Sequence, residues 1–394
     1  MFEVIQTAPP DSILGLNDAF QRDTRQQKIN LSVGVYKDAA GRTPILKSVK
    51  EAERRLLERE TTKTYLPIEG SGEFRDLTRN LVLGGIVSSD RVENLQSPGG
   101  TGGLRILADF LAKHLPHSRV WVSVPTWDNH TSLFGGAGLQ VESYPYLSAD
   151  KTTLDFNRMI NTLSEETKTG DVVLLHACCH NPTGVDPAES QWETIARIMG
   201  ERGLLPVVDF AYQGFGVDLD ADRRGIEILA QHCPEMLIAS SFSKNFGLYS
   251  ERVGAVSVVA ADQEAAQAVF SQLKRCIRTN YSNPPRHGGS IVQTVLADAA
   301  LQSEWRNEVT EMRKRIAAMR KDFVDQMASR QSKRDFSFLL RQKGMFSFSG
   351  LTPLQVDRLR SEFGVYIVGS GRINVAGITA ENIQLLCDAI TAVL

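Results

Sequence analysis

The sequence predicts an α/β protein whose sheet is mainly parallel and is covered by helices on both faces. Between residues 120 and 260, short apolar runs rich in β-branched residues continue without polar alternation, which is typical of strands buried on both faces. Helical stretches such as 189–202 separate several of these runs, as the crossovers between parallel strands require. The expected strands are 120–124, 172–175, 205–208, 236–239 and 253–260.

The C-terminal third has a different pattern. Between 302 and 330, apolar residues recur every three or four positions, from Trp305 to Met327, which predicts one long amphipathic helix with its apolar stripe in the core. Two strand-like segments follow, at 344–348 and 365–368, and a closing helix is expected near 380–394. Because 394 residues exceed the usual size of one hydrophobic core, we expect two domains. The pattern leaves open whether the first 45 residues join the second domain.

Composition excludes several classes of protein. The net charge of -2 and the pI near 6.4 do not provide the basic surface of a nucleic-acid binder. No apolar run approaches the roughly 18–20 residues that span a bilayer, and the first residues do not resemble a signal peptide. Five cysteines, an odd number, are poor material for a disulfide framework. We therefore expect a soluble, cytoplasmic protein that binds neither membrane nor nucleic acid.

Chemically active side chains follow four of the expected strands. An aromatic ring lies in segment 125–130 and an amide in 176–184. A carboxylate with a phenol lies in 209–212, and an amine with hydroxyls in 240–244. In an open parallel sheet, ligands bind at the carboxyl ends of the strands. A lysine desolvated at such a place is a typical Schiff-base nucleophile, which makes Lys244 the leading candidate. Asp209 either caps the next turn or faces a cationic partner.

Two other motifs are weaker. The glycine-rich segment 99–104 precedes an expected helical run at 104–112, but it fits neither a dinucleotide fingerprint nor a P-loop. It is either a generic anion cradle or a simple tight turn. His176, Cys178, Cys179 and His180 lie too close in the sequence to converge on one metal ion. We interpret them as buried cysteines and hydrogen-bonded histidines, and expect no metal.

Longer motifs resemble a known family. Segment 241–254 resembles the lysine signature of the class I pyridoxal-phosphate aminotransferases, and 180–184, 209–214, 280–285 and 370–377 belong to the same pattern. The likeness runs along the whole chain and is closest to the bacterial aspartate branch. It implies fold type I: a large cofactor domain at 46–305 with a mainly parallel seven-stranded sheet, and a smaller α+β domain from 1–45 and 306–394.

The resemblance also implies roles for individual residues. Lys244 would attach pyridoxal phosphate and later move a proton at the substrate α-carbon. Asp209 would face the cofactor's ring nitrogen, and Tyr212 would bond the ring's phenolic oxygen. His130 and His176 would lie behind the cofactor ring. The other cofactor contacts would be Gly100, Thr101, Trp127, Asn181, Ser241, Ser243, Arg252 and, from a neighbouring subunit, Tyr65.

The implied substrates are small amino acids and 2-oxo acids. Arg372 would hold the substrate α-carboxylate. Arg278, from the other subunit of a homodimer, would hold the distal carboxylate. The substrate site would be completed by Gly34, Trp127 and Asn181. This implies ping-pong exchange between L-aspartate and 2-oxoglutarate. Aromatic or dual specificity remains open, because Leu66-Pro67 resembles the aromatic branch. More distant alternatives are a nicotinamide-dependent oxidoreductase and a non-catalytic binding protein.

Overall fold

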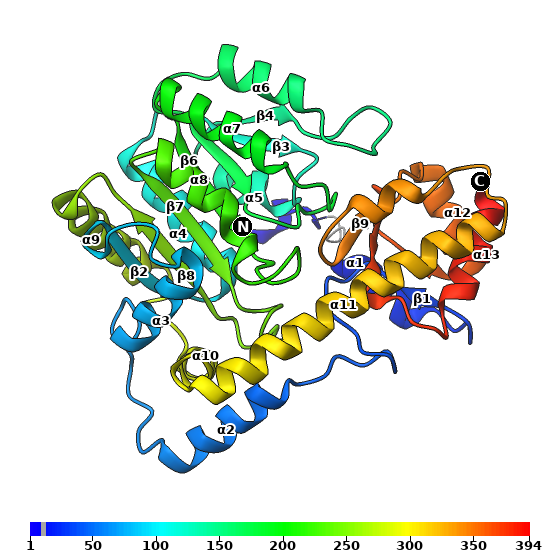
Figure 1. Ribbon diagram of the computed structural model, residues 1–394, viewed down its shortest axis with the longest axis horizontal. Helices are drawn as coiled ribbons and strands as arrows, with labels where there is room; N and C mark the ends of the chain where they lie inside the picture. The colour runs from blue at the N-terminus through cyan, green and yellow to red at the C-terminus, as the bar shows by residue number, and fades with distance from the viewer. Residues whose placement is uncertain (9–12) are drawn as a thin grey trace.

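A seven-stranded sheet forms the centre of the computed structural model, which describes residues 1–8 and 13–394 (Figure 1). The strand order is β2-β8-β7-β6-β5-β3-β4, and β8 is antiparallel to both its neighbours while the remaining pairs are parallel. The predicted mainly parallel α/β sheet is confirmed. Its strands are β2 (Val92–Ser97), β3 (Val120–Val124), β4 (Val141–Pro145), β5 (Val172–His176), β6 (Leu205–Phe210), β7 (Met236–Ser241) and β8 (Gly254–Val259).

The two strands at the edges of this sheet, β2 and β4, were not predicted. Both carry polar residues in place of a continuous apolar run. In β2, buried Asn94 donates a hydrogen bond to Thr78 Oγ1 at 3.0 Å, and Gln96 donates to the Pro285 carbonyl at 2.7 Å. Hydrogen bonding therefore replaces apolar burial in this strand, and hydrophobic patterning alone does not detect it.

Helices cover both faces of the sheet. One layer contains α4 (Gly99–His114), α5 (Asn129–Gly136) and α9 (Gln263–Asn280). The other contains α3 (Gly72–Leu83), α6 (Phe156–Glu165), α7 (Glu189–Arg202), α8 (Arg224–His232) and α10 (Arg286–Ala297) (Figure 1). Successive residues of β5 alternate between the two cores: Val172 and Leu174 pack with α4, and Val173 and Leu175 with α7. This double burial explains the unbroken apolar runs.

The helix α4 begins at Gly99 and not near Leu104, so of the two interpretations of segment 99–104 the simple tight turn is wrong. Its glycines allow close packing on the sheet: a Cβ at Gly100 would lie 3.1 Å from Ser241 Cβ, and one at Gly103 would lie 3.1 Å from Val256 Cγ2. The helix thus starts beside the end of β7 and the first residue of the antiparallel strand β8, with its free N–H groups at the carboxyl edge of the parallel strands.

The long helix α11 (Ala299–Ser329) runs beside the sheet and continues to the C-terminal part of the chain (Figure 1). Asp298 caps its N-terminus by accepting from the N–H groups of Ala300 and Leu301. Fully buried Trp305 stacks on Phe246 with ring centroids 4.3 Å apart and donates to the Asn245 carbonyl at 2.7 Å. The predicted apolar stripe is thus core, and it fixes α11 against the segment that follows Lys244.

The C-terminal part contains two small sheets. β9 (Phe346–Phe348) pairs antiparallel with β11 (Arg372–Asn374), and β1 (Ile29–Asn30) pairs parallel with β10 (Val365–Tyr366). The N-terminal strand is therefore joined to the C-terminal third, a contact that patterning left open. The remaining elements are η1 (Phe2–Val4), α1 (Leu14–Arg22), α2 (Lys47–Arg59), η2 (Ser89–Arg91), η3 (Ala221–Arg223), η4 (Ser337–Arg341), α12 (Pro353–Phe363), η5 (Val375–Gly377) and α13 (Ile383–Val393).

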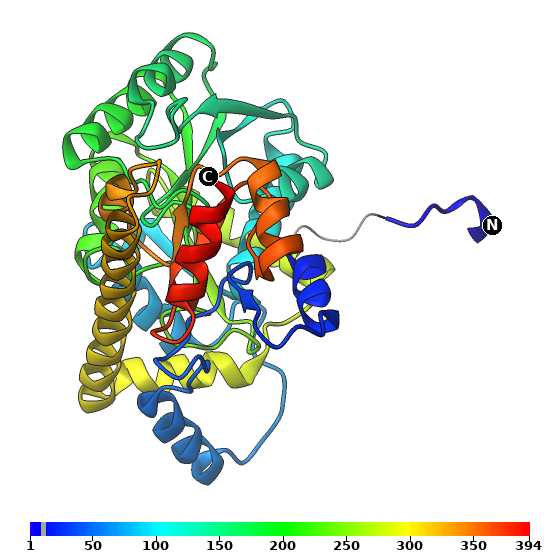
Figure 2. The ribbon, with the colours of Figure 1, turned by 90° about the vertical axis from the view of Figure 1, so that its right-hand side faces the viewer.

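The first residues of the chain extend away from the body of the molecule (Figure 2). Their large apolar side chains are exposed, including Phe2 and Val4. Among the helices of the described residues, none combines the length and the apolar character needed to cross a membrane.

Candidate active site

A cavity of about 540 Å³ opens where β5, β6 and β7 end, beside the start of α4 and facing β9 and β11. The strand-end rule predicted this place. Twelve of the predicted site residues line the cavity: Gly34, Gly100, Thr101, Trp127, Asn181, Asp209, Tyr212, Ser241, Ser243, Lys244, Arg252 and Arg372.

Lys244 supplies a desolvated amine to this cavity. Its Nζ lies 4.7 Å from the centroid of the Tyr212 ring and makes no hydrogen bond or ion pair with the residues that the structure describes. Burial lowers the pKa of Lys244 to about 8; Asp209 opposes this shift and Arg252 adds to it. The amine therefore loses its proton far more readily than that of an ordinary lysine, as a nucleophile requires.

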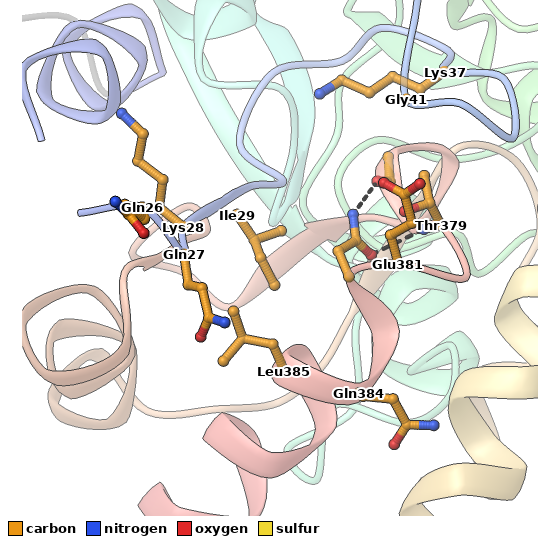
Figure 3. A pocket seen from close by; sticks show the side chains of 12 residues that line it. Gln26, Gln27, Lys28, Ile29, Lys37, Gly41, Thr379, Glu381, Gln384 and Leu385 are labelled. Atoms are coloured by element: carbon orange, nitrogen blue, oxygen red, sulfur yellow. Dashed lines mark hydrogen bonds between the residues drawn. The ribbon is translucent and has the colours of Figure 1, made fainter. Parts of the chain in front are cut away.

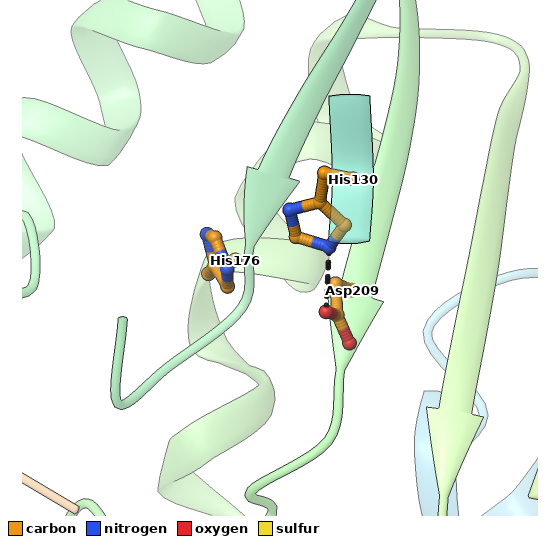
Figure 4. Close-up of side chains that lie close together, drawn as sticks. All are labelled: His130, His176 and Asp209. Carbon is orange, nitrogen blue, oxygen red and sulfur yellow. Dashed lines mark hydrogen bonds and ion pairs between the residues drawn. The ribbon is translucent and has the colours of Figure 1, made fainter. Parts of the chain in front are cut away.

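Asp209, at the end of β6, is held by a histidine behind it (Figure 4). His130 Nε2 lies 3.1 Å from Asp209 Oδ2, and His130 Nδ1 lies 2.8 Å from Thr126 Oγ1. Burial alone would raise the pKa of Asp209, but the hydrogen bond to His130 and nearby positive charge outweigh it, so the pKa lies below its usual value. Within the described residues no backbone N–H of the next turn donates to Asp209, which favours an anion that faces a cationic partner.

The two histidines expected to be hydrogen-bonded behave differently. His180 has partners at both nitrogens, Ser123 Oγ at 2.9 Å and Thr183 Oγ1 at 2.8 Å. Neither ring nitrogen of His176 has a partner among the described residues, so the expectation is wrong for this residue. His176 packs beside His130 with ring centroids 5.2 Å apart, and burial lowers its pKa to about 3. His176 is therefore a neutral ring in this part of the site.

One end of the cavity is suited to an anion. The N–H groups at the start of α4 lie beside the hydroxyls of Ser241 and Ser243 and the guanidinium of Arg252. Arg252 Nη1 donates to Ser243 Oγ at 3.1 Å, and Arg252 forms no ion pair among the described residues. A Cβ on Gly99 would lie 2.5 Å from Arg252 Nη2 and would displace that side chain, and the φ of +75° at this position also favours glycine. A helix N-terminus with an unpaired arginine is a strong phosphate site.

The opposite side of the cavity presents Arg372, from β11. Its Nη2 donates to the Ser32 carbonyl at 2.6 Å, its Nη1 donates to Asn181 Oδ1 at 3.3 Å, and its Cζ lies 4.2 Å from the centroid of the Phe346 ring. Arg372 is only 4% exposed and forms no ion pair within the described part of the chain. A held, unpaired guanidinium of this kind suits a carboxylate.

Two predicted residues lie outside the cavity. Tyr65 is 89% exposed. Arg278, near the end of α9, is exposed and donates a hydrogen bond to Ser282 Oγ. Their assignment to the site of a neighbouring subunit stays a prediction.

Six cavity residues were not predicted. Tyr249 lies within the lysine motif and could have been found there; its hydroxyl accepts from the Tyr36 backbone N–H at 2.9 Å. Phe346 lies in a predicted strand, but patterning could not show that its ring would contact Gly34 and Arg372. The full set is Ile13, Leu14, Leu104, Ala211, Tyr249 and Phe346.

Two other places could be mistaken for the site. A cavity of about 530 Å³ beside β1 and α13 contains Lys28, whose amine already donates to the Phe20 and Asp23 carbonyls at 2.8 and 2.6 Å (Figure 3). Elsewhere, the thiols of Cys178 and Cys179 approach Asp222. That carboxylate accepts from the N–H groups of Gly214, Gly216 and Val217, so hydrogen bonds to the backbone occupy it.

Comparisons with known proteins agree with this geometry. The family described as aminotransferase class I and II matches residues 26–390. The chain is 55% identical to the aspartate aminotransferase of Escherichia coli, over 100% of both chains. It is 47% identical to an aromatic-amino-acid aminotransferase of Pseudomonas aeruginosa, over 100% of this chain and 98% of that protein.

Among solved structures, the aromatic-amino-acid aminotransferase of Burkholderia pseudomallei, covalently bound to pyridoxal phosphate, superimposes with a TM-score of 0.97 at 46% identity. The superposition covers 100% of this chain and 99% of that chain. The expected fold type I is confirmed, and aminotransferase chemistry takes precedence over the oxidoreductase and binding-protein alternatives. The chain belongs to the class I and II aminotransferase family.

Proposed function

We propose that this aminotransferase uses pyridoxal phosphate to exchange the amino group between L-aspartate and 2-oxoglutarate, giving oxaloacetate and L-glutamate by a ping-pong mechanism. One observation carries the proposal: the weakly basic amine of Lys244 lies in a cavity that also contains the anion Asp209 and the unpaired cations Arg252 and Arg372. The identity to aspartate aminotransferases over the whole chain supports the choice of substrate.

The residues present fit the cofactor. Ser241, Ser243, Arg252 and the start of α4, with Gly100 and Thr101, would hold its phosphate, and Asp209 would face its ring nitrogen. Trp127 would cover the ring, and Asn181 and Tyr212 would bond its ring oxygen. When bound, pyridoxal phosphate supplies a carbonyl that captures amino groups and a ring that takes up the electron pair of the α-carbon.

The protein's own residues then position and transfer protons. Lys244, with a pKa near 8, accepts a proton from the substrate α-carbon and returns one during the second half of the exchange. His130 holds the Asp209 carboxylate in place. Arg372 orients the substrate by its α-carboxylate, and Gly34 leaves room beside the Phe346 ring, since a Cβ there would lie 2.7 Å from Phe346 Cζ.

Recognition of the second carboxylate requires a second chain. We infer a homodimer in which Arg278 of one subunit binds the distal carboxylate in the other subunit's site, and Tyr65 reaches the cofactor phosphate there. The exposure of both side chains in the single chain supports this assignment. A fixed cation opposite Arg372 would favour dicarboxylates, because a desolvated carboxylate needs a paired charge.

Aromatic substrates are the second candidate. The 46% identical aromatic-amino-acid aminotransferase shares the whole fold, and Leu66-Pro67 resembles the aromatic branch. The Leu66 carbonyl accepts from Asn283 Nδ2 at 2.8 Å. Relative kcat/KM for aspartate, tyrosine and phenylalanine on the purified protein separates the two specificities.

We further infer the division into domains at 46–305 and at 1–45 with 306–394, which the pairing of β1 with β10 supports. A cytoplasmic location is supported by the five cysteines, all of which are unpaired thiols. The dimer is tested by sedimentation of the purified protein.

The assignment of Lys244 is tested by trapping. Borohydride reduction of the cofactor-loaded protein, followed by peptide mass spectrometry, should place the cofactor on Lys244, and Lys244→Ala should carry none. Exposed Lys333→Ala is the matched control and should be labelled at Lys244 like the parent. Trapping at another lysine, or transamination by Lys244→Ala at the parent rate, would overturn the proposal.

A further inference from the structure

A second cavity, of about 200 Å³, lies between α11, the loop after β6 and the segment that leads from η4 to β9. Three cationic side chains line it, Arg313 and Arg320 from α11 and Lys343 from the segment before β9, and no acidic side chain does. In a chain of net charge -2, this is a marked local concentration of positive charge.

Arg320 is the buried member of this group. It is 6% exposed, donates to the Gly344 carbonyl at 2.5 Å and to Ser347 Oγ at 3.2 Å, and forms no ion pair among the described residues. Burial lowers the pKa of Arg320 to about 10. A buried guanidinium without a counter-charge is costly, so a binding partner is expected.

The other polar groups of the cavity also lack acceptors. Gln342 is 3% exposed; its Oε1 accepts from the Phe348 N–H at 3.2 Å, but its Nε2 has no partner among the described residues. Arg313 donates only to the Gly214 carbonyl, at 3.1 Å, and the exposed Lys343 amine has no ion pair in the described part of the chain. The cavity thus combines several hydrogen-bond donors with an excess of positive charge.

Two carboxylates, Asp222 and Asp186, interact electrostatically with Lys343, but neither supplies the missing acceptor. Asp222 accepts from backbone N–H groups of the loop after β6. Asp186 accepts from the N–H groups of Cys179 and His180 at 2.8 and 2.9 Å. Both carboxylates are buried or partly buried against the backbone, and neither forms an ion pair with Arg313, Arg320 or Lys343.

We propose that this cavity binds a small oxyanion, a phosphate or a carboxylate, between the Arg320 guanidinium, Arg313, Lys343 and the free amide N–H of Gln342. Guanidinium groups bind both kinds of oxyanion through paired hydrogen bonds. The site is separate from the candidate active site, although the segment after it continues to Phe346 and the Lys343 N–H donates to the Gly184 carbonyl at 2.7 Å.

The test uses the protein loaded with pyridoxal phosphate, so that the cofactor's own phosphate site is filled. Inorganic phosphate and succinate are added in separate arms, against chloride at the same ionic strength, and the unfolding midpoint is followed. At saturation we expect a rise of at least about 2 °C in one or both arms. A rise that the cavity variants weaken supports the proposal, and the arm in which it occurs identifies the class of ligand.

The variants assign the effect to the cavity. The double variant Arg313→Ala/Lys343→Ala should raise the anion concentration needed for half of the shift at least tenfold. Arg320→Lys should also raise it, because lysine lacks the paired donors of the guanidinium. Exposed Arg341→Ala, which removes a nearby positive charge outside the cavity, should behave like the parent. An anion that binds only at Arg372 would shift the unfolding midpoint equally in every variant, because none of them changes Arg372. Equal shifts in all variants, or no shift in the parent, would therefore overturn the proposal.

Discussion

The imidazole of His130 joins the Asp209 carboxylate to Thr126, with Nε2 3.1 Å from Asp209 Oδ2 and Nδ1 2.8 Å from Thr126 Oγ1. A carboxylate can only accept, so Nε2 carries a hydrogen and donates it to Asp209 Oδ2. This chain of hydrogen bonds fixes both the orientation and the charge of Asp209 at the base of the cavity.

This relationship predicts an order of effects. Asp209→Asn removes the negative charge and should lower kcat/KM for aspartate by at least about 10²-fold. His130→Ala leaves the charge but releases the carboxylate, and should cost roughly 10- to 100-fold, as loss of an orienting partner does. Steady-state rates at saturating cofactor measure both effects. A larger loss in His130→Ala than in Asp209→Asn would contradict the proposed roles.

Lys244 should destabilise the cofactor-free protein at neutral pH. Its pKa falls from 10.5 to about 8 on folding, so this destabilisation is absent above pH 10.5, grows as the pH falls towards 8, and is fully present below about pH 8. Cofactor-free Lys244→Met should therefore be more stable than the parent at pH 7, by on the order of 3 kcal/mol. Denaturant unfolding at pH 7 and pH 10.5 measures this difference.

The matched control for that experiment is Lys333→Met, which replaces an exposed lysine. It should change the free energy of unfolding little at either pH. If Lys244→Met and Lys333→Met have the same stability at pH 7, the amine of Lys244 is not desolvated in the folded protein.

Arg278 should determine the choice of substrate. Arg278→Leu should lower kcat/KM for aspartate by on the order of 10³-fold, because the distal carboxylate would be left desolvated and unpaired, while phenylalanine loses much less. Arg275→Leu, an exposed arginine in the same helix, is the control and should leave both values near those of the parent. An equal fall for aspartate and phenylalanine would reject this role for Arg278.

Gly99 should be required for cofactor affinity. In Gly99→Ala the new Cβ would displace Arg252, so we expect at least a tenfold weaker affinity for pyridoxal phosphate, measured by equilibrium dialysis. Gly85→Ala is a close control, because Gly85 has a similar φ of +80° but a Cβ added there would have no atom within 4 Å. Both variants should lose about 1 kcal/mol or more of stability, and only Gly99→Ala should lose affinity.

Much of the fold could be predicted because burial on both faces leaves a strong signal in the sequence. The five predicted strands and the helix α7 lie where continuous apolar runs and 3.6-residue periodicity placed them. The edge strands β2 and β4 lacked that signal, since an edge tolerates polar residues. The start of α4 was also missed, because glycine disfavours helices locally and its value here depends on packing against β7 and β8.

The sequence by itself determined which chemical groups are present and that Asn181, Asp209 and Lys244 follow the ends of neighbouring strands, because strand order along a parallel sheet brings those ends to one edge. The resemblance implied that Arg372 belongs to the site, but only the tertiary structure decided that Phe346 and Ser32 hold it there, that His176 has no hydrogen-bond partner among the described residues, and that Arg320 is buried without a counter-charge. Those properties depend on contacts between residues far apart in the chain, and local patterns carry no information about them.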